Sequence, residues 1–222
     1  MNIRYQVAQH FQYFRNLPGS KSIASLTALE SLISLSVINP PKLILEYGTG
    51  IGTISSLLLN FTDCRIISIE NRPEVHAIAI KNISYISGNF GKRFKIINGE
   101  YEIKANEWNL FDWIIIDGPV NIKKINLSES LVYIIVENQR LLTRLKIVTK
   151  LTWSKRRFSY GELDSSRETG VAFFYLNPRS KSNLLVYFDF LGVSLLLIPR
   201  LVRSIARSRG KILKVGKLLE SE

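Results

Sequence analysis

The chain has 222 residues, of which 46% are hydrophobic and 22% are charged, and these proportions exclude an intrinsically disordered protein. A formal net charge of +12 predicts attraction to an anionic partner, either nucleic acid or an acidic membrane surface. The single cysteine, Cys64, excludes an internal disulfide framework and a cysteine-based zinc site, and two widely separated histidines do not suggest a histidine metal cluster.

Two amphipathic helices are predicted before the first strand, over residues 3–17 and 22–36, because apolar side chains recur there at helical spacing. Pro40 and Pro41 end this lead-in, so residues 1–40 are expected to form an N-terminal helical segment. The first ten residues lack the apolar core of a signal peptide, which predicts a cytoplasmic location.

Residues 42–52 organise the rest of the chain. An apolar run is followed by Glu46 and then by Gly48, Gly50 and Gly52 at alternate positions, after which apolar residues recur at helical spacing. This pattern predicts a strand, a tight glycine-rich turn and a helix. A glycine turn lets the backbone approach a ligand closely, and the helix that follows directs free N–H groups toward it.

The spacing Glu-x-Gly-x-Gly-x-Gly resembles motif I of the class I S-adenosylmethionine-dependent methyltransferases, whereas dinucleotide-binding loops read Gly-x-Gly-x-x-Gly. Taken alone, the loop also fits a glycine-rich turn in another α/β protein. The resemblance implies S-adenosylmethionine as the cofactor. It also implies that Gly48, Gly50 and Gly52 admit the cofactor, and that Glu46 fixes the loop and the cofactor's amino end.

The second and third predicted strands, over residues 65–69 and 94–97, each lead to a candidate cofactor ligand. Glu70 ends the second strand, where a carboxylate can accept hydrogen bonds from both ribose hydroxyls; the alternative is an ordinary exposed strand-end glutamate. After the third strand, the resemblance implies an acidic or polar side chain near the adenine amine. Glu100 and Asn98 are the candidates, although an ordinary polar turn also fits.

The fourth predicted strand, over residues 111–116, is a buried apolar run that ends in Asp117, Gly118 and Pro119. Ligands of open α/β sheets bind at the carboxyl ends of the strands, so Asp117 points to where an acceptor would lie. Members of the resembling family that methylate oxygen often read Ile-Asp-Gly here. Enzymes that methylate the amines of bases read Asp/Asn-Pro-Pro-Tyr/Phe, which this chain lacks. Asp117 is thus the candidate for positioning the acceptor or removing its proton.

The fifth predicted strand, over residues 132–136, ends in Glu137 and Asn138. Metal-dependent catechol-type O-methyltransferases carry one Asp after the fourth strand and an Asp-Asn pair after the fifth. By this resemblance Asp117, Glu137 and Asn138 are candidate ligands of Mg²⁺, which prefers oxygen ligands. The alternative is that no metal binds, that Asp117 positions the acceptor and that Glu137 is a strand-end carboxylate.

A closing hairpin is predicted over residues 156–176. The fold class is therefore α/β: a Rossmann-like methyltransferase sheet over residues 41–178, mostly parallel, with seven strands, a terminal antiparallel hairpin and flanking helices. Residues 179–222 form a helical extension beyond this core, with an apolar stretch followed by a basic amphipathic one. Residues 184–217 are expected to touch an anionic membrane from the surface or to form a homodimer interface; plain packing and RNA binding are the alternatives.

The predicted function is S-adenosylmethionine-dependent methyl transfer, with O-methylation of a small, lipid-linked or sugar-linked acceptor. Two alternatives stay open: a non-catalytic interaction module built on a cofactor-binding fold, and an RNA methyltransferase that uses the basic tail. An NAD enzyme ranks last because the glycine spacing does not suit it.

Overall fold

The computed structural model describes residues 2–87, 91–99, 101–137, 140–154, 156–163 and 171–176. The predicted extension over residues 179–222 and the expected contacts of residues 184–217 lie outside the described residues. Within the described ranges, no helix is long and apolar enough to cross a membrane.

Seven strands form one sheet in the order β3-β2-β1-β4-β5-β7-β6. Neighbours from β3 through β5 pair in parallel, and β7 runs antiparallel to both β5 and β6. The predicted sheet with its terminal antiparallel hairpin is thereby confirmed. The strands are β1 (Leu43–Tyr47), β2 (Arg65–Glu70), β3 (Phe94–Asn98), β4 (Trp113–Ile116), β5 (Tyr133–Glu137), β6 (Ser159–Leu163) and β7 (Val171–Tyr175).

The central strands are apolar throughout because both of their faces are covered. All four residues of β4 are buried, and alternate residues point to opposite sides of the sheet. In β1, Leu45 belongs to the core cluster on one face, whereas Ile44 belongs to the cluster on the other. The side chain of Cys64 is fully buried in that second cluster.

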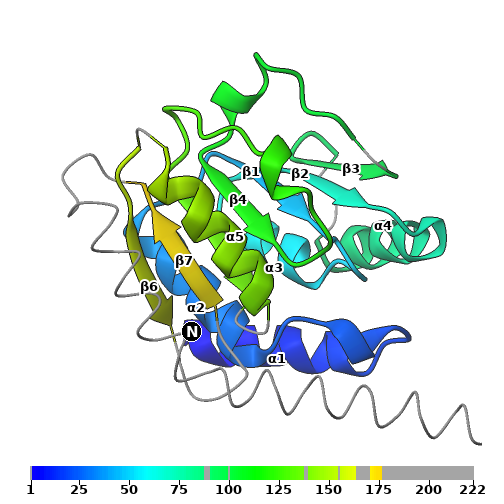
Figure 1. Cartoon of the computed structure of the whole chain (residues 1–222). Helices are drawn as coiled ribbons and strands as arrows, with labels where there is room; N and C mark the ends of the chain where they lie inside the picture. Colours follow the sequence, from blue (N-terminus) through cyan, green and yellow to red (C-terminus); the bar gives the residue numbers. More distant parts are fainter. Residues whose placement is uncertain are drawn as a thin grey trace, which may run out of the picture.

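Helices cover the two faces unequally (Figure 1). One face packs against α2 (Leu26–Ile38), α3 (Thr53–Phe61) and α4 (Pro73–Ser87), with α1 (Ile3–Arg15) against α2 and α3. The other face packs against α5 (Leu141–Thr152) and against residues 101–112 and 117–131, which include the short 3₁₀ helices η2 (Trp108–Leu110) and η3 (Ile122–Lys124). The α4 and α5 helices therefore lie on opposite sides of the sheet.

The predicted bounds of the first two helices were wrong. The second helix begins at Leu26 rather than at residue 22, because the hydroxyl of Ser25 caps it by accepting the N–H of Ala28 at 3.1 Å. The preceding residues instead form a separate 3₁₀ turn, η1 (Ser20–Ser22). The first helix ends at Arg15, two residues before the predicted end at 17.

The sheet brings the predicted site residues to one edge. Because β1, β2, β4 and β5 run parallel, their carboxyl ends meet there, with Glu70 ending β2 and Glu137 ending β5. Asp117 directly follows β4, and its backbone N–H donates to the carbonyl of Tyr47 in β1 at 2.9 Å. The fold thus gathers carboxylates that are far apart in the sequence.

Candidate functional site

The three glycines of the loop between β1 and α3 all have positive φ, but they differ in what a side chain at each position would contact. A Cβ at Gly48 would lie 2.5 Å from the backbone N and Cα of Gly118, so this position holds the β1 and β4 loops in contact. A Cβ at Gly52 would lie 2.8 Å from Ile83 of α4. A Cβ at Gly50 would meet nothing within 4 Å, so Gly50 alone faces open space.

Glu46 anchors the glycine loop from its buried side. Its side chain is 1% exposed and accepts hydrogen bonds from the hydroxyls of Ser55 in α3 and Ser68 in β2. The Ser68 hydroxyl is also 2.6 Å from that of Thr49 in the loop. These bonds tie β1, β2 and α3 together. Glu46 is not among the residues lining the cleft described below, so its predicted contact with a cofactor stays a prediction.

We expect Glu46→Gln to change how stability depends on pH. Burial raises the pKa of Glu46 from 4.5 to about 7, against the opposing hydrogen bonds from Ser55 and Ser68. The folded protein thus keeps a proton that the unfolded chain releases. The stability contributed by this carboxyl is fully present below pH 4.5 and is lost as the pH rises through about 7.

Because glutamine cannot ionise, the Glu46→Gln variant should lose about 2.5 kcal/mol less unfolding free energy than the wild type between pH ~5 and pH ~8. Urea unfolding at the two pH values, without ligand, measures this difference. Equal losses in the two proteins would show that the Glu46 carboxyl has an ordinary pKa.

Glu70 reaches across from β2 to the glycine loop. Its Oε2 accepts the backbone N–H of Gly50 at 2.9 Å. Its Oε1 accepts both the backbone N–H and the Nε–H of Arg72, at 3.1 and 3.0 Å. Desolvation alone would raise the pKa of Glu70, but the bonds from Arg72 and Gly50 outweigh it and lower the pKa. The Glu70 side chain is therefore ionised at neutral pH and is held in place by these hydrogen bonds.

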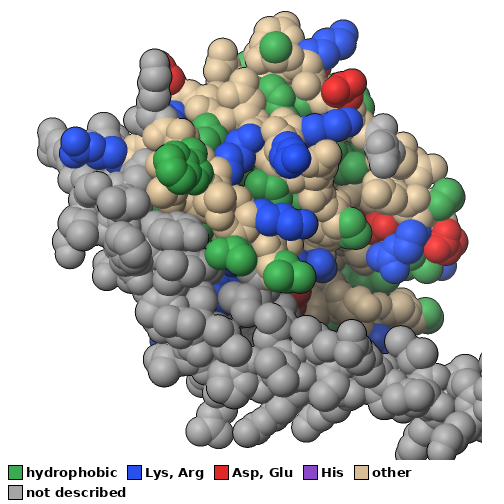
Figure 2. Space-filling model, viewed as in Figure 1, with side chains coloured by type: hydrophobic (Ala, Val, Ile, Leu, Met, Phe, Trp, Pro, Cys, Tyr) green, Lys and Arg blue, Asp and Glu red, His purple; other side chains and the backbone are tan. Residues whose placement is uncertain are grey.

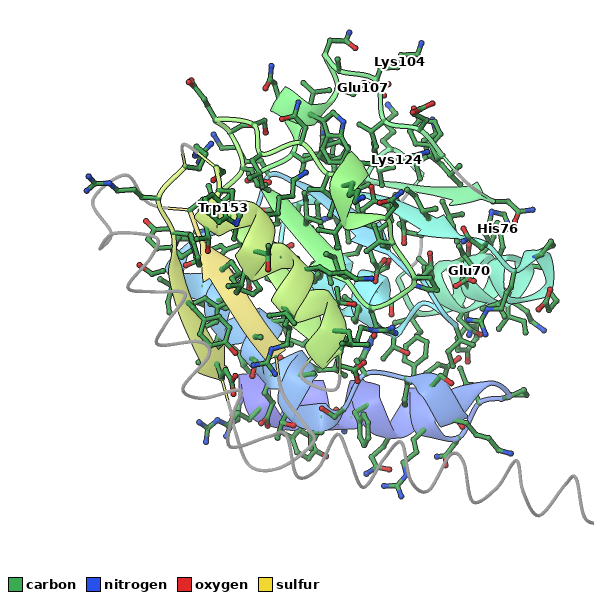
Figure 3. All side chains as sticks on the ribbon, viewed as in Figure 1. Glu70, His76, Lys104, Glu107, Lys124 and Trp153 are labelled. Atoms are coloured by element: carbon green, nitrogen blue, oxygen red, sulfur yellow. The ribbon has the colours of Figure 1, made fainter. Side chains whose placement is uncertain are left out.

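A cleft of about 890 Å³ opens at this edge of the sheet, within the size range of small-molecule sites. One part is formed by the glycine loop and Glu70, and another by Asp117 and the residues that follow it; Figure 3 labels Glu70 and Lys124 on its rim. The lining residues are Ser22, Tyr47, Gly48, Gly50, Ile69, Glu70, Asn71, Arg72, Tyr101, Glu102, Ile103, Trp108, Asp117, Gly118, Pro119, Val120, Asn121, Lys124 and Arg140.

Asp117 lies in this cleft within a group of three charged side chains. Its carboxyl is hydrogen-bonded to that of Glu137, and its Oδ1 is 3.7 Å from Nη2 of Arg140. The Nε of Arg140 is 3.8 Å from Oε2 of Glu137, and Nη2 donates to the backbone carbonyl of Asp117. Burial, and then the neighbouring Glu137, raise the pKa of Asp117 well above its usual range, against the opposing charge of Arg140. The Asp117 carboxyl is thus harder to ionise than that of an isolated aspartate.

The metal candidates are only partly brought together. Asp117 and Glu137 are in contact, but Asn138 lies outside the described residues. Among the residues that the structure describes, no three His, Cys, Asp or Glu side chains are placed to hold a metal ion. The positive charge beside the carboxyl pair is the guanidinium of Arg140.

Sequence reasoning missed the basic partners of the carboxylates. Arg72 and Arg140 follow β2 and β5 by two and three residues, so a search for basic residues just after strand-end carboxylates would have found them. Sequence reasoning also missed Tyr47, the residue between Glu46 and Gly48 in the motif. Burial raises the pKa of Tyr47 to about 12, so its side chain is neutral in the cleft. Glu100, the predicted adenine contact, lies outside the described residues.

The segment between α1 and α2 packs on the glycine loop. Gly19 has a φ of +87°, and a Cβ there would lie 2.8 Å from Cγ2 of Ile51. Ser22, a few residues on, lines the cleft. The segment that joins α1 and α2 therefore forms part of the cleft wall through Ser22.

No protein-family model matches the chain, and no curated protein is similar to it in sequence. Solved structures are similar in fold. A putative caffeoyl-CoA O-methyltransferase from Staphylococcus aureus aligns with a TM-score of 0.57 and 20% identity over 79% of this chain and 93% of that one. The SAH-bound methyltransferase PaMTH1 from Podospora anserina aligns with a TM-score of 0.56 and 20% identity over 80% and 89%. An O-methyltransferase from Bacillus cereus in complex with SAH aligns with a TM-score of 0.56 and 19% identity over 78% and 90%.

The agreement extends over most of the described chain and over almost the whole length of each of these proteins. It coincides with the independent observations made above: the strand order, the glycine loop after β1 and the carboxylate at the end of β2. The chain therefore has the Rossmann-like fold of the class I S-adenosylmethionine-dependent methyltransferases.

Proposed function

We propose that the protein transfers a methyl group from S-adenosylmethionine to a hydroxyl oxygen of a small, lipid-linked or sugar-linked acceptor. The observation that carries this proposal is the cleft itself. It joins an open glycine loop with an ionised Glu70 to a partly buried Asp117 of raised pKa. The similarity in fold to O-methyltransferases supports the same reaction class.

The described residues fit the cofactor on one side of the cleft. Gly50 leaves room where any side chain would intrude, because a Cβ there would point into open space. The Glu70 carboxylate has lone pairs beyond those used by Gly50 and Arg72, so it can accept hydrogen bonds from ribose hydroxyls. When bound, S-adenosylmethionine supplies an activated methyl group on a sulfonium, and the protein's task is to align the acceptor oxygen with it.

In this proposal Asp117 receives the acceptor's proton. As the oxygen–methyl bond forms and the methyl–sulfur bond breaks, the hydroxyl proton has to leave, and the Asp117 carboxylate would accept it. Arg140 balances the remaining negative charge from beside both side chains. A base with a raised pKa suits proton removal near neutral pH.

We propose that this transfer proceeds without Mg²⁺, because Arg140 already supplies the positive charge beside Asp117 and Glu137. Adding EDTA should therefore leave the turnover unchanged, and added Mg²⁺ should not raise it. A loss of activity with EDTA that Mg²⁺ restores would instead favour the metal site predicted at Asp117, Glu137 and Asn138.

The function is tested by measuring S-adenosylhomocysteine release with a panel of phenolic, sugar and lipid-linked hydroxyl acceptors, with amine acceptors and RNA as comparisons. Release that requires a hydroxyl acceptor supports O-methylation. Cofactor binding with no release for any acceptor would favour the non-catalytic interaction module, and release with RNA would favour the RNA methyltransferase. A cytoplasmic location and membrane or dimer contacts of residues 184–217 remain proposals.

A further inference from the structure

The solvent side of α5 carries an apolar residue at each end and lysines between them. These residues stand at positions i, i+4, i+8 and i+11 of the helix, which places them along one ridge. The opposite side, with Ile147, Val148 and Leu151, is buried against the sheet. The ridge consists of Leu142, Lys146, Lys150 and the capping residue Trp153.

The two apolar residues of the ridge are strongly exposed. Of the large hydrophobic side chains that the structure describes, Trp153 is 85% exposed and Leu142 is 61% exposed. About 16 Å of helix separates them. The ridge therefore carries one exposed apolar residue near each end, with Lys146 and Lys150 between them.

The 3₁₀ helix η3 extends this surface with two more lysines. Lys150 Nζ donates to the backbone carbonyl of Lys123 at 3.0 Å, which fixes η3 beside α5. Within the described residues, Lys123 and Lys146 form no ion pair, and Lys124 has only a 4.0 Å pair with Glu102 in which both side chains are exposed. Figure 2 shows Lys and Arg side chains gathered over α5 and η3, with apolar side chains between them. We call the ridge together with Lys123 and Lys124 the α5 basic face.

We propose that the α5 basic face docks on an anionic phospholipid bilayer. Lysines attract a negatively charged membrane surface, each contributing on the order of 1 kcal/mol. A tryptophan with an exposed ring favours the boundary between headgroups and acyl chains. The charges and the apolar residues lie on one side of one helix, so both can meet a flat surface at the same time.

Other partners fit this face less well. A second copy of the chain also has a net charge of +12, so the two lysine-rich faces would repel each other. Single-stranded nucleic acid is held by several aromatic side chains that stack on successive bases, whereas the face offers only Trp153. The combination of lysines with an aliphatic and an aromatic anchor favours a lipid surface.

The docking surface adjoins the cleft. Lys124 belongs both to the α5 basic face and to the lining of the cleft, and in Figure 3 it lies between Trp153 and Glu70. Docking would hold the cleft mouth near the headgroups, where a lipid-linked acceptor would be found. That last step rests on the proposed methyl transfer, whereas docking itself does not.

Co-sedimentation of the full chain with vesicles of phosphatidylcholine and phosphatidylserine tests the proposal, with pure phosphatidylcholine vesicles for comparison. The Lys123→Gln/Lys146→Gln variant should bind the anionic vesicles about 25-fold more weakly, about fivefold for each lysine. High salt should remove this difference. Trp153→Ala should weaken binding to both kinds of vesicle, because the tryptophan's contribution is not electrostatic.

The matched control is Lys81→Gln/Lys92→Gln, which removes two exposed lysines away from α5, one of them on α4 across the sheet. It should bind as the wild type does. Equal losses in both double variants, or no loss in Lys123→Gln/Lys146→Gln, would overturn the proposal. Unchanged vesicle binding with weaker binding of a labelled single-stranded RNA would assign the face to nucleic acid instead. Vesicle binding needs no methyl transfer, so it fails or succeeds independently of the proposed function.

Discussion

Gly48→Ala should unfold far more easily than the wild type, by about 4 kcal/mol, and should lose cofactor binding. The new Cβ would lie 2.5 Å from the backbone of Gly118, and backbone atoms cannot move aside as a flexible side chain can. The φ of +90° at this position adds strain for any residue that has a Cβ. The β1 and β4 loops would have to separate, which opens the floor of the cleft. Urea unfolding measures the first effect and calorimetric titration with S-adenosylmethionine the second.

Gly50→Ala is the matched control. Its φ of +54° lies in the left-handed region that side chains can adopt, and its Cβ would meet nothing within 4 Å, so the cost should be about 1 kcal/mol. If the alanine points into the cleft as the backbone indicates, cofactor affinity should still fall. Equal unfolding free energies for the two variants would show that the loops do not touch at Gly48.

Asp117→Asn should lower turnover at least 100-fold while cofactor affinity stays close to that of the wild type. Asparagine keeps the shape of the side chain and can still hydrogen-bond to Glu137, but it cannot take a proton from the acceptor. Removing one of two adjacent carboxyls also removes their repulsion, so the variant should be at least as stable as the wild type. Single-turnover methyl transfer with an identified acceptor gives the rate.

The exposed Asp63, in the turn before β2 at the far end of the sheet, provides the control for this substitution. Asp63→Asn should leave both rate and affinity unchanged. Turnover that survives in Asp117→Asn would remove Asp117 from the chemistry. Parallel losses of rate and cofactor affinity would make it a binding residue instead.

The sheet and its functional edge were predictable because local chemistry marks them. Parallel strands buried on both faces read as short apolar runs, and each of the predicted strands ends at a carboxylate or a polar turn. The positive-φ glycines and the strand-end position of Glu70 follow from the same reading. Parallel pairing then brings those ends together without further information.

The charge partners were not predictable in the same way. Arg140 acts on Asp117 and Glu137 only because β4 and β5 are neighbours, and its chain position after β5 does not say which way the guanidinium turns. Glu46 presents the opposite case. The motif suggests a cofactor ligand, whereas the structure buries its carboxyl behind the loop with two serines that no motif specifies.

The start of α2 shows a third limit. Several serines precede the apolar face of this helix, and each is a chemically acceptable N-cap. Only the packed structure selects Ser25, because the residues before it turn to meet the glycine loop. Element types were therefore easier to predict than the residues where they begin.

Calorimetric titration of the purified protein with S-adenosylmethionine tests the central claim most directly, with NAD as the comparison ligand and Glu70→Ala and Glu70→Gln as variants. The account predicts saturable binding of S-adenosylmethionine, no binding of NAD, and an affinity about 100-fold weaker in both Glu70 variants, because each loses a charged hydrogen-bond acceptor. A folded wild-type protein that does not bind S-adenosylmethionine, or Glu70 variants that bind it as tightly as the wild type, would contradict the account.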